Sequence, residues 1–135
     1  MNTDIAAQKA LDRLARVGFE LLTEREKILA TVWTFESRVV NQGFARYFSS
    51  SAGDMASFAP TAFRSVGAPQ KAEIAAKANL VFGPEGPAGD RDTRRELVQS
   101  FGACAKKTFD ELEREFYLSP EDVDDLLEVY INKNG

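Results

Sequence analysis

The side chains that most often carry out catalysis or bind metal ions are scarce in this sequence. Its 135 residues include no histidine and one cysteine, Cys104, which we expect to be a small core residue. These counts exclude Ser-His-Asp and Cys-His catalysis, zinc or iron–sulfur centres and an internal disulfide bond. Two features could still do chemistry: Glu36, and a cluster of Arg91, Arg94 and Arg95. Neither implies a cofactor, and no metal ligands are predicted.

Glu36 lies among apolar residues in a segment expected to be helical. Its neighbours three and four positions away are Val32, Trp33, Val39 and Val40. Without partners, a carboxylate on such a face should have a raised pKa, as a general acid does, but no second catalytic group accompanies it at a fixed spacing. Because buried polar groups are normally hydrogen-bonded, we expect a structural role in which Glu36 accepts from backbone N–H groups, an asparagine or a tyrosine.

The arginine cluster follows the glycine- and proline-rich segment 83–89. Free N–H groups at a helix start can bind phosphate, but the segment lacks the GxxxxGK[ST] and GxGxxG spacings. We therefore expect a helix connection whose arginines pair with nearby acidic residues. An enzyme acting on a small molecule or a phosphoryl group through Glu36 or these arginines stays open as an alternative, and a pocket joining those residues would support it.

Charge is distributed unevenly along the chain. The net charge is −4, yet residues 110–135 hold nine acidic and two basic residues, and residues 1–109 have a small positive excess. On a helical projection these acids lie opposite the apolar residues, in rows that rise by about 1.5 Å per residue, close to the roughly one charge per 1.7 Å of duplex DNA. The predicted protein-binding residues are Asp110, Glu111, Glu113, Glu121, Asp122, Asp124, Asp125 and Glu128. A helix face that is merely solvated stays open as the alternative.

The elements that position these residues are predicted to be helices throughout. Apolar residues recur at spacings of three and four residues, and no stretch of six or more residues alternates cleanly between apolar and polar. We expect an all-α fold, a single compact bundle of about six helices. The helices span about residues 4–17, 23–43, 56–66, 69–82 and 91–117, the fifth weakened near Gly102, and a last helix starts at Ser119-Pro120. Helix-start signals support three of these starts: Thr23 with Glu26, Asp90, and Ser119-Pro120.

Length and composition indicate one soluble globular domain, residues 1–135. Hydrophobic residues make up 44% and charged residues 28% of the chain. No apolar run approaches the roughly 20 residues of a membrane span, and residues 1–4 lack the basic start of a signal peptide. We therefore expect a cytoplasmic protein.

A series of short motifs resembles a known family. The order Glu36, Val40-Asn41-Gln42-Gly43-Phe44, Tyr47-Phe48, Ser51 and Gly53-Asp54 is similar to the E…VNNGGFxQYFxNSxGD signature of a bacterial all-helical family, mostly known as a domain of unknown function. Residues 62–68 resemble its ALxxIGA element, and residues 112–117 and 127–131 resemble its LDxxFY and LLxxYI ending. The resemblance covers about residues 23–131. It departs from the signature at Gln42, Arg46 and Ser50.

The resemblance implies a helical scaffold and a possible mode of action. Its structural motif residues here are Glu36, Asn41, Gly43, Phe44, Tyr47, Phe48, Gly53 and Gly67. The family includes a DNA mimic protein, an acidic dimer that occupies the DNA-binding surface of a transcription regulator. The shared residues are those of a scaffold, whereas mimicry depends on surface acids that no motif fixes.

Taken together, these observations predict a non-enzymatic protein-binding module. Its acidic face would meet a basic protein, with a DNA-binding regulator as the specific candidate, and would repel nucleic acid and membrane phosphates. An immunity-type partner of a toxin-like protein stays open as a further alternative. Whether the protein forms a homodimer is left open by the sequence.

Overall fold

The computed structural model describes residues 2–134, which form seven α-helices, two 3₁₀ helices and no strand. In chain order the elements are α1 (Asn2–Val17), η1 (Phe19–Leu21), α2 (Glu24–Ser49), η2 (Ser51–Phe58), α3 (Ala59–Ser65), α4 (Pro69–Leu80), α5 (Arg91–Ser100), α6 (Ala103–Leu118) and α7 (Val123–Asn134). The all-α prediction is confirmed. The count exceeds six because the helix expected over 91–117 is two helices, α5 and α6, that separate at Phe101 and Gly102.

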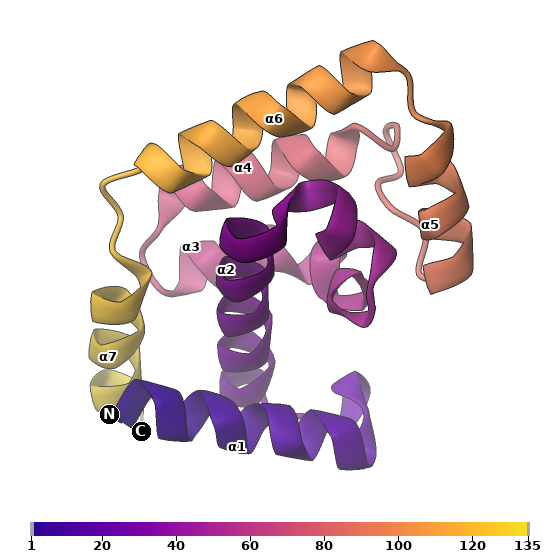
Figure 1. Cartoon of the computed structure of the whole chain (residues 1–135). Coiled ribbons are helices and arrows are strands. Elements are labelled where there is room, and N and C mark those ends of the chain that lie inside the picture. The colour runs from indigo at the N-terminus through magenta and orange to yellow at the C-terminus, as the bar shows by residue number, and fades with distance from the viewer. Residues whose placement is uncertain (1, 135) are drawn as a thin grey trace.

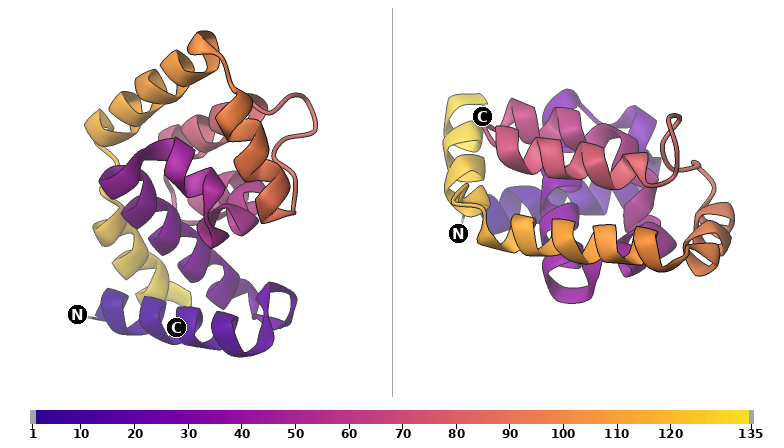
Figure 2. Two further views of the ribbon diagram at one scale, coloured as in Figure 1. Left: turned by 45° about the vertical axis from the view of Figure 1, so that its right-hand side comes forward. Right: turned by 90° about the horizontal axis from the view of Figure 1, so that it is seen from above.

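Helix α2 is the central element of the fold. Figure 1 shows α1 crossing one end of α2, while α4 and α6 cover the other end. The view from above in Figure 2 shows α4 and α6 side by side, with α7 at one end of this pair and α5 at the other. Helix α7 turns back from α6 and packs against α1. The C-terminal helix is therefore at one edge of the molecule and α5 at the opposite edge.

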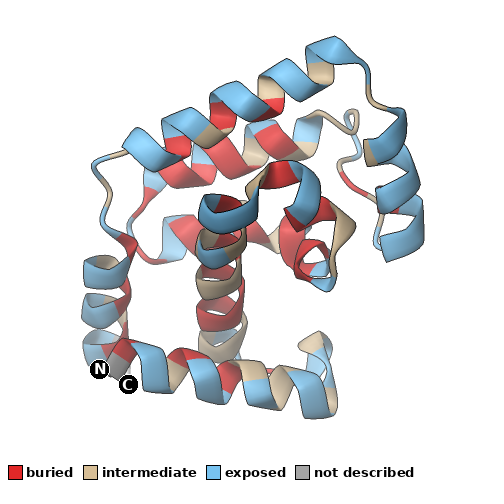
Figure 3. Ribbon diagram, in the orientation of Figure 1, coloured by how far each residue is buried: buried red, intermediate tan, exposed pale blue. Residues whose placement is uncertain are grey.

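The core is built from aromatic side chains that lie far apart in the sequence. The Phe35 ring of α2 has its centroid 4.8 Å from that of Tyr47, 5.0 Å from Phe63 and 5.3 Å from Phe116. Tyr47 and the motif residues Phe44 and Phe48 are buried, as expected of packing aromatics. Each such ring pair stabilises the fold by about 0.5–1.5 kcal/mol in addition to the stabilisation from burying the ring surfaces. Figure 3 shows the buried positions facing this interior and the exposed ones covering α5, α6 and α7.

Gly43 breaks α2 into two helical segments. Its φ of 83° and ψ of 171° are not helical, and side chains rarely allow this conformation. The Glu113 carboxylate of α6 fills the space beside it, 2.9 Å from where a Cβ would stand. The same carboxylate accepts a hydrogen bond from the N–H of Phe44 at 2.8 Å. Glu113 thus caps the start of the second segment from a distant helix.

Local start signals are confirmed at two helices and wrong at a third. Thr23 and Glu26 form a complete capping box, and the Asp90 carboxylate accepts from the N–H of Thr93 at 2.9 Å. The last helix, however, begins at Val123 rather than at Ser119-Pro120, because Asp122 accepts from the N–H of Asp125 and supplies the cap.

Two other motif glycines have defined places, and the cysteine is not where it was expected. Gly67 follows α3 with φ of +87°. Gly53 is buried in η2, where a Cβ would lie only 2.9 Å from the Arg94 side chain and 3.0 Å from the Phe48 backbone. The expectation that Cys104 is a core residue is wrong. It lies in the first turn of α6, on the side facing solvent, and is exposed.

Candidate protein-binding surface

Four acidic side chains mark the start and the outer side of α7. We call Asp122, Asp124, Asp125 and Glu128 the α7 carboxylates, and all four residues are exposed. Val123, Leu127 and Ile131 bury the opposite side of the helix, as the helical projection predicts. Among the described residues, no lysine or arginine nitrogen lies within 4.0 Å of these four carboxylates. The α7 carboxylates therefore form an uncompensated negative surface at the edge of the molecule (Figure 1).

The acids of α6 have a different electrostatic setting. Asp110 and Glu111 are exposed, but Lys106, Lys107 and Arg114 share the exposed part of the same helix. At spacings of three and four residues, opposite charges on a helix are neighbours and offset one another. Within α6 there are three basic and four acidic residues, whereas residues 119–135 hold five acidic residues and one lysine. The negative excess of the C-terminal region therefore lies mainly on α7 and the turn before it.

Two of the predicted surface residues are used inside the fold. Glu113, expected to point away from the core, caps Phe44 as described above. Glu121 accepts from the backbone N–H groups of Gln70 at 2.9 Å and Lys71 at 2.8 Å, which are unpaired at the start of α4. Glu121 joins the turn before α7 to α4, and its charge faces a helix N-terminus. The structure thus separates Glu113 and Glu121 from the exposed α7 carboxylates.

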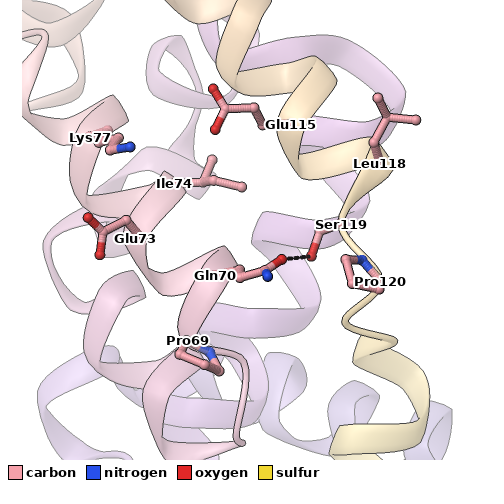
Figure 4. A pocket seen from close by; sticks show the side chains of 9 residues that line it. All are labelled: Pro69, Gln70, Glu73, Ile74, Lys77, Glu115, Leu118, Ser119 and Pro120. Carbon is pink, nitrogen blue, oxygen red and sulfur yellow. Dashed lines mark hydrogen bonds between the residues drawn. The ribbon is translucent and has the colours of Figure 1, made fainter.

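The corner beside Glu121 is an open groove of about 550 Å³ between α4 and α6. Figure 4 shows the hydrogen bond across it, in which the Ser119 hydroxyl donates to the Gln70 side-chain oxygen at 3.2 Å. The same Ser119 oxygen accepts from the N–H of Glu121, so Ser119 orients the turn rather than starting the helix. Glu115, an acid not predicted for the surface, lines this groove together with Lys77. The groove has both signs of charge.

Glu36 has a partner that the sequence did not suggest. Its carboxylate lies 3.3 Å from the ammonium of Lys71, which is only 5% exposed and sits 4.4 Å from the centre of the Phe116 ring. The expectation of backbone, asparagine or tyrosine donors is therefore wrong, although a structural role is in keeping with this partly buried pair. Burial raises the pKa of Glu36, Lys71 opposes that rise, and the charges of Asp124 and Asp122 add to it.

Glu36 is only partly exposed to solvent. About a third of its side chain is exposed, at 32%. The negative charges of Asp122 and Asp124 add to the rise of its pKa. The ammonium of Lys71 is directed at Glu36. Glu36 is therefore paired within the fold and adds no free charge to the α7 carboxylates.

The arginine cluster stabilises loops and pairs with acids. Arg94 is fully buried at 0% exposure and donates to the carbonyls of Phe48, Ser50, Ala88 and Gly89 and to the Asp54 carboxylate. The expected pairing with acidic residues is confirmed for this cluster. The other two pairs are Arg95 with Asp92 at 2.7 Å and Arg91 with Asp54 at 3.9 Å.

Sequence reasoning missed the two buried cations, Lys71 and Arg94. A signal existed for Lys71, because it precedes Ala75 and Ala78 by four and seven residues and so belongs to the buried stripe of α4. Five of the best-formed pockets among the described residues do not join Glu36 to the arginines: none of them is lined by Glu36, and the largest of the five is lined by Arg91 alone of this cluster. The condition set for the enzyme alternative is therefore not met by these pockets.

Comparison with known proteins identifies one family. The family model described as "DMP19-like protein" matches residues 20–134. No curated protein and no solved structure matches the chain at a significant level. Within the described part of the chain, no group of three His, Cys, Asp or Glu side chains is placed to hold a metal ion, and no helix is long and apolar enough to cross a membrane.

Proposed function

Because the chain belongs to the DMP19-like protein family, which is a DNA-mimic type, we propose that it binds a basic DNA-binding protein through the α7 carboxylates. The role is non-catalytic: the carboxylates occupy the lysine and arginine positions that otherwise contact DNA phosphates. Such binding places the protein in the cytoplasm beside its partner. Family membership supports the proposed role as a DNA mimic. The unpaired α7 carboxylates support the proposal that the partner binds at this surface.

The observation that carries the proposal is the absence of cations around the α7 carboxylates in the described structure. An acid already paired with an arginine of its own chain gains little from a basic partner. The α7 carboxylates are exposed instead, and a guanidinium of a partner can form charge-assisted hydrogen bonds with them. Because the helix rises about 1.5 Å per residue, Asp124 and Glu128 are separated by about 6 Å along its axis.

Electrostatic binding of this kind depends steeply on salt. Exposed charges are screened over about 10 Å at 0.1 M salt and about 3 Å at 1 M. Opposite surface potentials also speed the encounter of two proteins, and that acceleration is lost as salt rises. The complex should therefore form at low ionic strength, weaken as salt is added, and be displaced by duplex DNA.

The test uses a variant that removes charge without removing caps. Asp124→Asn, Asp125→Asn and Glu128→Gln together neutralise three α7 carboxylates, while Asp122 and Glu121 are kept because they cap α7 and α4. The matched control is Asp110→Asn with Glu111→Gln on α6, where cations alternate with the acids. Each protein is immobilised, exposed to native lysate, and the retained proteins are identified and then purified.

We expect the wild type and the α6 control to retain the same DNA-binding protein, and the α7 variant to bind it at least about tenfold more weakly. In a gel-shift assay with the purified partner, the wild type and the α6 control should release its DNA at a concentration at which the α7 variant does not. Equal retention by the α7 variant, or binding unchanged by salt, would refute the proposal. Retention of a toxin-like protein that binds no DNA would support the immunity-type alternative instead.

A further inference from the structure

A separate cavity lies on the other side of α2 from this acidic surface. It has a volume of about 760 Å³, is partly open to solvent, and is bordered by α1, η1, α2, η2 and the start of α5. Its apolar lining includes five large side chains, Leu11, Leu14, Phe19, Trp33 and Met55, together with Ala15 and Ala52. Small-molecule sites typically measure 300–1,000 Å³ and combine such a lining with a few polar groups. None of the α7 carboxylates lines it.

Part of the polar lining of this cavity lies along one edge of α2, and Glu20, Ser51, Asp54 and Arg91 line it from η1, η2 and α5. Trp33, Thr34, Ser37 and Arg38 all line it, and their spacing of four and five residues puts them on one side of the helix. Within about 7.5 Å of helix rise, the edge thus changes from an indole through two hydroxyls to a guanidinium. A ligand lying along it would meet apolar contacts first and a positive charge last.

Arg38 is available to a ligand. Its guanidinium donates a hydrogen bond to the side-chain oxygen of Gln42 at 3.3 Å, and no carboxylate of the described residues lies within 4.0 Å of it. Asp54 also lines the cavity, but the buried Arg94 binds it at 2.6 Å and compensates its charge. The other acid, Glu20, lies on η1.

A second groove continues from Arg38 and adds further positive charge at that end of the cavity. It has a volume of about 520 Å³, lies between α2 and α5, and shares Arg38 with the first cavity. Arg46 and Arg95 also line it, and its lining includes no acidic residue. Arg95 is paired with Asp92, which leaves Arg38 and Arg46 without a carboxylate within 4.0 Å among the described residues. The two hollows together join an apolar chamber to a cationic end.

We propose that this cavity binds a small amphipathic anion, with its apolar body against Trp33 and Phe19 and its carboxylate or phosphate at Arg38. The planar guanidinium matches both of these anions with two parallel hydrogen bonds. The Thr34 and Ser37 hydroxyls form hydrogen bonds with polar atoms of the ligand that lie between its apolar body and its anionic group. The site is independent of the proposed protein-binding surface, because the two use different sides of α2 and share no residue.

The chain supplies its own reporter for this site, because Trp33 is its single tryptophan. The probe is anilinonaphthalene sulfonate, an aromatic body with one anionic group, whose fluorescence accepts energy from tryptophan. The matched neutral probe is phenylnaphthylamine, which has the same rings without the sulfonate. Titrations of the folded full chain, with Trp33 excited selectively, measure binding of each probe, and the Arg38 variants distinguish this cavity from other apolar surfaces.

We expect energy transfer from Trp33 to the sulfonate probe, and Arg38→Gln should weaken its binding at least about tenfold while changing that of the neutral probe by less than about twofold. Arg38→Lys keeps the charge and should bind better than Arg38→Gln. The control Arg64→Gln, an exposed arginine of α3 outside the cavity, should bind as the wild type does, as should the α7 variant. Circular dichroism confirms that each variant is folded.

Two results would overturn the proposal. One is the absence of energy transfer from Trp33, since the probe would then not occupy this cavity. The other is equal loss of sulfonate binding in Arg38→Gln and Arg64→Gln, which would show that general charge rather than this guanidinium attracts the anion. Neither result bears on the α7 carboxylates, whose test measures binding of a protein.

Discussion

Replacing Arg94 with methionine should be among the most destabilising single changes in this protein. Methionine keeps much of the length of the arginine stem but donates no hydrogen bond. Arg94 is fully buried and donates five hydrogen bonds of 2.6 to 3.0 Å, four to backbone carbonyls and one to Asp54. Through these bonds it joins the end of α2 and η2 to the loop before α5.

The size of the stability loss depends on how each acceptor of Arg94 is affected when its hydrogen bond is removed. A hydrogen bond from a charged donor contributes about 1.5–3 kcal/mol, but the contributions within one network do not add. The Asp54 side chain is 46% exposed and recovers hydration when Arg94 is removed, whereas the bond to the Phe48 carbonyl is buried. We therefore expect Arg94→Met to lower the free energy of unfolding by about 3–5 kcal/mol, the range for breaking a buried charged network. The corresponding fall in Tm is roughly 10–20 °C.

Urea unfolding followed by circular dichroism and by Trp33 fluorescence measures this loss, and agreement of the two signals checks for a two-state transition. Arg94→Lys should lie between wild type and Arg94→Met, because an ammonium keeps the charge but cannot span the same acceptors. The control is Arg95→Met on the same helix, whose exposed pair with Asp92 contributes less than about 1 kcal/mol. A loss for Arg94→Met no larger than that for Arg95→Met would refute the reasoning.

Two further predictions concern the Glu113 cap and the Glu36 pair. Gly43→Ala should lower the free energy of unfolding by about 1–3 kcal/mol, because it imposes strain at positive φ and displaces the Glu113 carboxylate; Glu113→Gln, which keeps an acceptor for Phe44, should cost less in the same urea titration. A loss for Gly43→Ala no larger than for an exposed helix position would contradict this account. For Glu36, burial raises the folded-state pKa, so its contribution to stability is complete below the unfolded pKa of about 4.5 and is lost as pH rises through the folded pKa. The stability of the wild type relative to Glu36→Gln should therefore be higher at pH 4 than at pH 7, at constant ionic strength. An increase in that difference toward pH 7 would mean that Lys71, rather than burial, dominates the Glu36 carboxylate.

Much of the helical framework was predictable because helix starts and breaks depend on a few consecutive residues. Thr23 with Glu26 and Asp90 satisfy N–H groups within their own first turns, so a short window of sequence contains both donor and acceptor. Ser119-Pro120 shows the limit of such signals. Its hydroxyl binds Gln70, 49 residues earlier, and Asp122 caps the helix instead.

The sequence by itself determined the all-α class, most helix positions, the aromatic core and the negative excess near the C-terminus, since residue counts and helical periodicity contain that information. Only the tertiary structure decided which charges remain free for a partner. Glu113 caps Phe44 across 69 residues, Glu36 meets Lys71 across 35, and Arg94 reaches Phe48 across 46. A helical projection shows which way a side chain points from its own helix, but what that side chain meets depends on how distant helices pack around it.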